Sequence, residues 1–132
     1  SPTKSMGRAS INGERIMVID DEPLNLKLME AHLAPEAYLI KCLNSGKHIL
    51  DEINAFLPDI ILLDVIMPDM DGAQVCDRMK EINPDLKILV SSGYAIESEA
   101  RRALAKGCNG LIQKPFSLKQ LSEKIRGILD GN

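Results

Sequence analysis

Five polar side chains in this sequence each end or follow a short apolar run, and their types suit the chemistry of phosphate. They are Asp20, Asp21, Asp64, Ser92 and Lys114. A carboxylate can attack phosphorus as a nucleophile and form an acyl phosphate. A serine hydroxyl can donate a hydrogen bond to a phosphoryl oxygen, and a lysine supplies a compact positive charge. Together these residues could accept and stabilise a phosphoryl group.

The three aspartates among them need a compensating charge if they meet at one point. Carboxylates that converge repel one another, and without compensation at least one would hold a proton. A hard divalent cation with oxygen ligands resolves this repulsion. Mg²⁺ suits a site that supplies few carboxylates and keeps several waters. The sequence therefore predicts a Mg²⁺ site made by Asp20, Asp21 and Asp64.

The elements that must position these residues alternate along the chain. Apolar runs predict strands at residues 15–19, 38–43, 59–63, 86–91 and 110–113. Helical spacing predicts helices at residues 24–33, 45–56, 73–82, 96–106 and 118–129. Strands that alternate with helices indicate a parallel sheet with helices on both faces. Because ligands bind at the carboxyl ends of strands in such sheets, the five polar residues are expected at one edge.

Several residues mark the expected ends of helices. Ser45 and Ser117 are expected to cap the helices that follow them, since a serine oxygen can accept a bond from the first turn. Asp69 and Asp71 are assigned to the loop after Asp64 and to the cap of the next helix rather than to the metal site. Gly107 is expected to end the fourth helix.

Composition narrows the class of protein. The chain has 132 residues, enough for one domain with its own core. A net charge of −3 and a pI near 5.4 argue against nucleic acid as the main partner. The apolar runs are too short to span a membrane.

The three cysteines lack metal-ligand spacing and are interpreted as buried or half-buried thiols in a reducing cytoplasm; they are Cys42, Cys76 and Cys108. The polar residues 1–14 are interpreted as a linker or tail, and the domain is assigned to residues 15–132.

Four segments, VIDDEP, LLDVIMPDMDG, SSGYA and QKPF, occur in this order at four strand ends. Together they resemble the receiver domain of bacterial two-component response regulators, and the resemblance covers residues 15–129. It implies a flavodoxin-like (βα)5 fold, doubly wound, with a five-stranded parallel sheet in the order 2-1-3-4-5. It also implies a protein of phosphorelay signal transduction that does not turn over a free substrate.

The resemblance assigns a role to each candidate residue of the metal site. Asp64 resembles the phosphoacceptor and Asp21 the direct metal ligand. Asp20 resembles the acidic partner that binds the metal through water. The backbone carbonyl of Ile66 resembles the third protein ligand of Mg²⁺.

The resemblance also assigns roles around the phosphoryl group. Ser92 matches the switch residue, and Lys114 matches the lysine before proline. The Lys114–Pro115 bond resembles one that is cis in this family. The partners implied are a histidine kinase or histidine phosphotransfer protein as phosphodonor. A homodimer through the fourth helix, fifth strand and fifth helix is a further implied partner.

Two departures from the family pattern bear on the switch. Leu111 stands where the family often has Tyr or Phe, which puts the aromatic half of the usual switch in doubt. Ile66 and Tyr94 are bulky at the two positions that flank the path of an attacking water, and neither could orient that water. We therefore expect slow self-hydrolysis of the acyl phosphate.

Two other functions are weighed against phosphoryl acceptance. A phosphorylation-independent binding module on the same fold is the main alternative. A Mg²⁺-dependent phosphohydrolase is weakened because Ile66, rather than a second aspartate, lies two residues after Asp64. The lead-in INGERIMVIDDE resembles the junction before the C-terminal receiver of hybrid histidine kinases, and a stand-alone regulator is the runner-up.

Overall fold

Five parallel strands form the central sheet, in the order β2-β1-β3-β6-β7. The computed structural model describes residues 13–64, 66–67, 70–92, 101–102 and 104–131. The strands of this sheet are β1 (Arg15–Ile19), β2 (Leu39–Leu43), β3 (Ile60–Asp64), β6 (Lys87–Ser92) and β7 (Gly110–Gln113). This is the 2-1-3-4-5 order predicted from the sequence, so the flavodoxin-like fold is confirmed.

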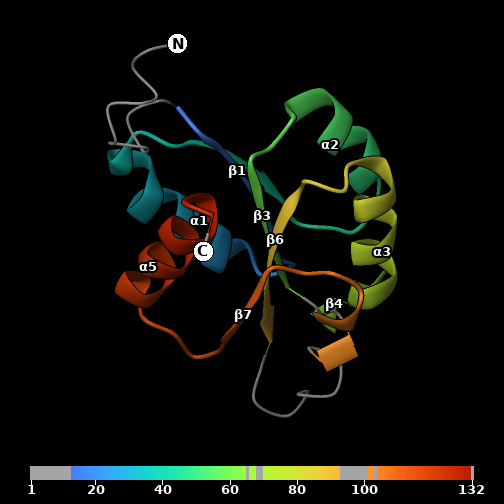
Figure 1. Ribbon diagram of the computed structural model, residues 1–132. Helices are drawn as coiled ribbons and strands as arrows, with labels where there is room; N and C mark the ends of the chain where they lie inside the picture. Colours follow the sequence, from blue (N-terminus) through green and yellow to red (C-terminus); the bar gives the residue numbers. More distant parts are fainter. Residues whose placement is uncertain (1–12, 65, 68–69, 93–100, 103, 132) are drawn as a thin grey trace.

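The helices cover both faces of this sheet. They are α1 (Pro23–Leu33), α2 (Ile49–Phe56), α3 (Gly72–Ile82) and α5 (Leu118–Leu129), with a short 3-10 turn at Ala34–Glu36. Figure 1 shows α1 and α5 on one face and α2 and α3 on the other. Residues 101–102 and 104–105 are also helical; the rest of the helix predicted at 96–106 lies outside the described residues.

The strands are buried on both faces, as expected for a parallel sheet. Every residue of β3 is buried, and the four residues from Ile16 to Ile19 have no exposed surface. Side chains of β1, β3 and β6 alternate between two apolar clusters. One cluster packs under α2 and α3 and the other under α1 and α5. This rigid centre fixes where the strands end.

Only one face of α1 is buried, that of Leu26, Met29 and Leu33. Other apolar residues of the helix stay in solvent, since Leu24 is 61% and Leu28 50% exposed. On α2, Ile49 and Ile53 are buried and Phe56 is partly buried.

The prediction that Ser45 begins and caps α2 is wrong. The helix begins at Ile49, and the residue before it, His48, has a left-handed backbone with φ of 61°. The hydroxyl of Ser45 instead accepts a hydrogen bond from the Lys47 amide at 3.0 Å. A serine that bonds its own turn in this way competes with the helix that it could otherwise cap.

The other expected helix ends are confirmed where they are described. Asp71 caps α3 by accepting from the amides of Ala73 and Gln74, and Ser117 caps α5. Gly107, with φ of +103°, follows the fourth helix. Asp69 lies outside the described residues. The segment predicted as a loop after Asp64 contains a small antiparallel pair, β4 (Ile66–Met67) and β5 (Met70–Asp71).

Candidate functional site

The carboxyl ends of four strands bring the predicted site residues to one edge of the sheet. Asp20 directly follows β1, Asp64 is the last residue of β3, and Ser92 is the last of β6. Lys114 directly follows β7. Asp20, Asp64 and Ser92 are each 5% exposed or less, while Asp21 is exposed. The parallel strands therefore place these polar residues at one edge of the sheet, as predicted from their positions at the strand ends.

Three carboxylates meet at this edge. One carboxylate oxygen each from Asp20, Asp21 and Asp64 lies within 4.8 Å of the other two. Oxygen ligands at that spacing fit a hard divalent cation, and a group with so few protein ligands suits Mg²⁺ with its retained waters. Two of the carboxylates are buried, where like charges repel strongly. The donor set present thus fits the predicted ion.

Local hydrogen bonds hold Asp20 in place. Its carboxylate Oδ1 accepts from the amide of Glu22 at 2.9 Å, which fixes the turn that enters α1. The backbone amide of Asp20 donates to the carbonyl of Leu43 at 3.0 Å, so the end of β1 stays attached to β2. The second carboxylate oxygen, Oδ2, remains directed to the site, where it pairs with Lys114.

Lys114 lies between the two buried carboxylates. Its Nζ is 3.2 Å from Oδ2 of Asp64 and 3.4 Å from Oδ2 of Asp20. Burial by itself would lower the pKa of Lys114, but the charges of Asp64 and Asp20 outweigh it and hold the pKa above its usual value. The ammonium is therefore positively charged at the site and offsets part of the carboxylate charge.

The segment around Lys114 is held on both sides. The amide of Lys114 donates to the carbonyl of Ser92 at 2.7 Å, which ties the lysine to the end of β6. The Lys114–Pro115 peptide bond is cis, as the resemblance implied. Ser117 and Gln120 then form a reciprocal capping box that starts α5. Lys114 thus joins the site to a helix with a fixed beginning.

The remaining predicted residues have different outcomes. Ile66 lies in β4, two residues after Asp64, and its role as a carbonyl ligand stays a prediction. Leu111 lies on β7, partly buried against the cluster under α3. Tyr94 lies outside the described residues, so the expectation that rests on its bulk stays a prediction as well.

One contact beside the site was not predicted. Nη2 of Arg102 lies 3.2 Å from Oδ2 of Asp71, which joins the fourth helix to the hairpin that follows Asp64. A hydrogen bond from Arg102 holds the pKa of Asp71 below its usual value. The partners are 31 residues apart, and nothing in their local sequence shows that the fold brings them together.

Comparisons with known proteins give one consistent family. A family model described as the response regulator receiver domain matches residues 16–126. Response regulator MprA of Mycolicibacterium vanbaalenii is 33% identical over 115 residues, which is 87% of this chain and 50% of that protein. A probable transcriptional regulator, ycf27, of Guillardia theta is 28% identical and is matched over 45% of its length. The chain thus spans about half the length of these curated relatives.

Solved structures agree with the sequence comparisons. A CheY-like receiver domain protein from Methanospirillum hungatei superposes with a TM-score of 0.83 at 27% identity, covering 89% of this chain and 94% of that one. The receiver domain of NtrX from Brucella abortus gives a TM-score of 0.82 at 26% identity, with 89% and 99% covered. Among the described residues, no helix has the length and apolar character needed to cross a membrane.

Proposed function

The chain belongs to the response regulator receiver domain family, which acts in phosphorelay signal transduction, and from that premise we propose that Asp64 is the residue that accepts the phosphoryl group. One observation carries the proposal. Asp64 is buried at the end of the central strand β3, with an ammonium 3.2 Å away and two further carboxylates within 4.8 Å. This arrangement surrounds a nucleophilic carboxylate with the charges that phosphoryl transfer requires.

The transfer forms a bond from a carboxylate oxygen of Asp64 to phosphorus while the bond from phosphorus to the donor breaks. From a phosphohistidine, the leaving group is the imidazole nitrogen, which takes a proton from solvent. Asp20, Asp21 and Asp64, with the backbone carbonyl of Ile66, would hold Mg²⁺. When bound there, the ion supplies positive charge for the oxygens of the transferring group.

Lys114 and Ser92 act on the product in this proposal. Lys114 already contacts Asp64 and would pair with a phosphoryl oxygen, since the new group carries more negative charge than the carboxylate. Ser92 is buried at the end of the neighbouring strand and would donate its hydroxyl proton to a second oxygen. Movement of Lys114 and Ser92 toward the phosphoryl oxygens would shift the equilibrium between two arrangements of the face formed by the fourth helix, β7 and α5.

The phosphodonor in this proposal is a protein with a phosphohistidine, either a histidine kinase or a histidine phosphotransfer protein. Apolar surface beside the site suits such a partner, because Leu28 is 50% exposed next to a groove that reaches Lys114. The groove is lined by Asn25, Leu28, Met29, Pro115, Phe116 and Leu118. Pairing of two copies through the fourth helix, β7 and α5 remains part of the proposal.

The test uses small phosphodonors that need no partner. Acetyl phosphate with Mg²⁺ should add one phosphoryl group to the wild-type chain, seen by intact-mass spectrometry, and none to Asp64→Ala. Asp77→Ala, which removes an exposed carboxylate from α3, is the matched control and should be modified normally. Modification of Asp64→Ala at the wild-type rate would contradict the proposal, and steady turnover of a phosphate ester would favour a phosphohydrolase.

The lifetime of the product tests the second part of the proposal. Because Ile66 offers no acid or amide to orient water, the phosphorylated chain should lose its phosphoryl group slowly. The decay of the phosphorylated mass after removal of acetyl phosphate measures this rate. A lifetime of only seconds in the presence of Mg²⁺ would contradict slow self-hydrolysis while leaving Asp64 as the acceptor.

A further inference from the structure

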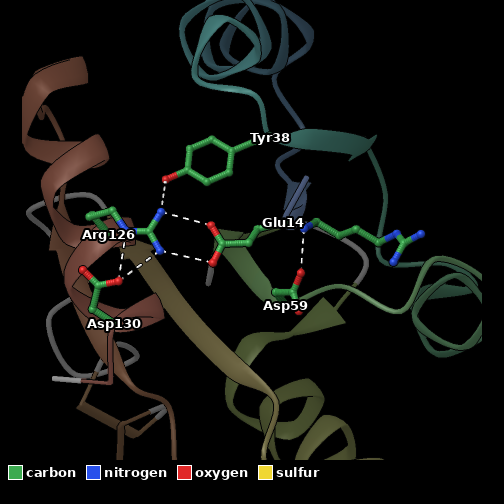
Figure 2. A network of polar contacts seen from close by, with 6 residues as sticks. Glu14, Tyr38, Asp59, Arg126 and Asp130 are labelled. Carbon is green, nitrogen blue, oxygen red and sulfur yellow. Dashed lines mark hydrogen bonds and ion pairs between the residues drawn. The ribbon is translucent and has the colours of Figure 1, made fainter. Parts of the chain in front are cut away.

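Arg126 joins α5 to the residues that precede β1 and β2, at the edge of the sheet opposite Asp64. Its guanidinium forms a two-pronged ion pair with Glu14, with Nη1 3.0 Å from Oε1 and Nη2 3.2 Å from Oε2. Nη1 also donates to the hydroxyl of Tyr38 at 3.1 Å, and Nε donates to Asp130 at 3.2 Å. Figure 2 shows Arg126 reaching from α5 to all three partners.

Glu14 is the residue through which the chain enters the fold. It is only 9% exposed and directly precedes β1. Its carbonyl accepts from the amide of Leu39 at 2.9 Å, and the next amide, that of Arg15, donates to Asp59 at 2.7 Å. Figure 2 shows this second bond beside the ion pair. The backbone that leads from Glu14 into β1 is therefore held by β2 and by Asp59, while the side chain of Glu14 is held by α5.

The other end of α5 begins beside the proposed phosphoacceptor. Lys114 contacts Asp64, and the capping box of Ser117 and Gln120 starts α5 within three residues of that lysine. The helix has 12 residues, about 18 Å at the usual rise per residue. It ends in the turn that holds Arg126. A displacement of Lys114 would thus move the first turn of α5, and the last turn of the same helix binds Glu14 through Arg126.

The middle of α5 is attached to α1 as well as to the sheet. Leu121, Ile125 and Ile128 are its buried face. The hydroxyl of Ser122 lies 2.9 Å from His32 of α1 and donates to Glu36 at 3.2 Å. Packing along its whole length favours motion of α5 as one body over bending within it.

We infer that Arg126 couples the phosphoacceptor site to the chain segment that precedes β1, by transmitting a displacement of α5 to Glu14. The inference rests on the proposed role of Asp64. The coupling would let phosphorylation affect a second region, which lies outside the face formed by the fourth helix, β7 and α5. The segment affected is residues 1–14, which the sequence predicts to be a linker or tail.

The fork of the guanidinium is what this role requires. Two parallel hydrogen bonds fix the angle of Glu14 as well as its distance, which a single ammonium cannot do. Glu14 is also too buried to be solvated if Arg126 leaves it, so the pair moves together rather than separating. Arg126 is accordingly a positioning residue that does not touch the reacting atoms.

Hydrogen exchange followed by mass spectrometry tests the coupling with beryllofluoride and Mg²⁺ as the phosphoryl mimic. The reporters are the amide of Arg15, which follows Glu14, and the amide of Leu39, which donates to the Glu14 carbonyl. A peptide that contains Asp64 reports on binding itself. In the wild type, beryllofluoride should change exchange at both reporters by at least about twofold, the scale of a small shift in local opening. Arg126→Gln should lose this response and keep protection at Asp64.

Two further variants make the result specific to the ion pair. Asp130→Asn removes only the charge of the most exposed partner of Arg126, whose side chain is 49% exposed, and should respond as the wild type does. Glu14→Gln keeps the shape and one acceptor while removing the charge, and should lose the response like Arg126→Gln. It also carries the test if Arg126→Gln shows no cooperative thermal transition.

The outcomes separate this inference from the proposed function. Reporter responses of wild-type size in Arg126→Gln or in Glu14→Gln would overturn the coupling. Protection at Asp64 in the wild type without any response at Arg15 and Leu39 would also overturn it and leave Asp64 as the acceptor. No protection at Asp64 in the wild type would overturn the proposed function and the coupling together.

Discussion

Lys114 divides its charge between two buried carboxylates, and this sharing sets what else the site can bind. Its Nζ is within 3.4 Å of an oxygen of both Asp64 and Asp20. A divalent cation that enters must approach an edge where a positive charge already stands. An incoming phosphoryl group, by contrast, finds that charge in place. If Asp64 accepts the phosphoryl group as proposed, the lysine should favour the phosphorylated product at the expense of metal affinity.

Replacing Lys114 by methionine should move these two properties in opposite directions. Without the competing ammonium, Mg²⁺ should bind several-fold more tightly in a calorimetric titration. Modification by acetyl phosphate should slow by about 10- to 100-fold, the cost of losing one charge-assisted hydrogen bond. Lys119→Met, on the exposed surface of α5, is the control and should leave both unchanged. Weaker Mg²⁺ binding in Lys114→Met would show that the lysine organises the metal site instead.

Cys42 and Cys76 should be poor nucleophiles. Burial raises the pKa of Cys42 from 9.0 to about 11, with the charge of Glu30 adding to the effect. A hydrogen bond with Cys108, followed by burial, raises the pKa of Cys76. Since only the thiolate reacts, Cys42 at pH 8 should be alkylated about 100-fold more slowly than a thiol of pKa 9.0.

Iodoacetamide labelling followed by peptide mass spectrometry measures this reactivity. The rate at Cys42 should keep rising up to about pH 11, because the thiolate fraction still grows there. Urea-unfolded protein provides the fast reference for each cysteine. Rapid labelling of Cys76 in the folded protein at pH 8 would indicate that the buried surface opens often.

The residues of the site could be predicted because their position depends on strand ends alone. Asp20, Asp64 and Lys114 each end or follow an apolar run, and parallel strands place such residues at one edge whatever the details of packing. Arg126 could not be found in this way. Its partner Glu14 is 112 residues distant, and only the packing of α5 on the sheet brings them together.

At the scale of elements, two serines of the same predicted role behave differently. Ser117 accepts from the amide of Gln120 at 3.0 Å, and the side chain of Gln120 accepts in return from the amide of Ser117. Ser45 bonds the amide of Lys47 instead, and the helix begins only at Ile49. Both sequences offer a serine before an apolar pattern. Helix α2 begins later than predicted because His48 has a left-handed backbone. A glycine at that position would have indicated this conformation in the sequence, but a histidine does not.

Replacement of the two serines by alanine should therefore lower the free energy of unfolding by different amounts. Ser117→Ala should lower the free energy of unfolding by about 1 kcal/mol, the usual cost of a lost N-cap. Ser45→Ala should cost less than about 0.5 kcal/mol, as expected for a surface turn away from such a cap. Urea unfolding followed by circular dichroism measures both. Equal losses would mean that the Ser45 turn is as important to α2 as the capping box is to α5.

At the scale of the whole molecule, the fold gathers the three carboxylates of the candidate site at one edge of the sheet. The two apolar clusters on either side of the sheet tolerate no charge, so the carboxylates of the site can lie only where the strands end. Lys114 offsets part of their repulsion through Asp64 and Asp20. Asp21 is exposed and adds to the charge of the cluster. The domain should therefore be less stable without a divalent cation than with one.

This charge balance predicts that Asp21→Asn changes stability with opposite signs in two buffers. In EDTA the variant should be as stable as the wild type or more stable by up to about 1 kcal/mol, because one repelling charge is gone. At a Mg²⁺ concentration about ten times its dissociation constant, the wild type should gain about 1.4 kcal/mol, because the ion binds only the folded state. Asp21→Asn should gain much less at the same concentration, so the order of stability reverses.

Asp77→Asn, which changes an exposed carboxylate of α3, is the control and should show the wild-type gain in thermal unfolding. A gain of wild-type size in Asp21→Asn would remove Asp21 from the metal site, since a true ligand cannot lose its charge without cost.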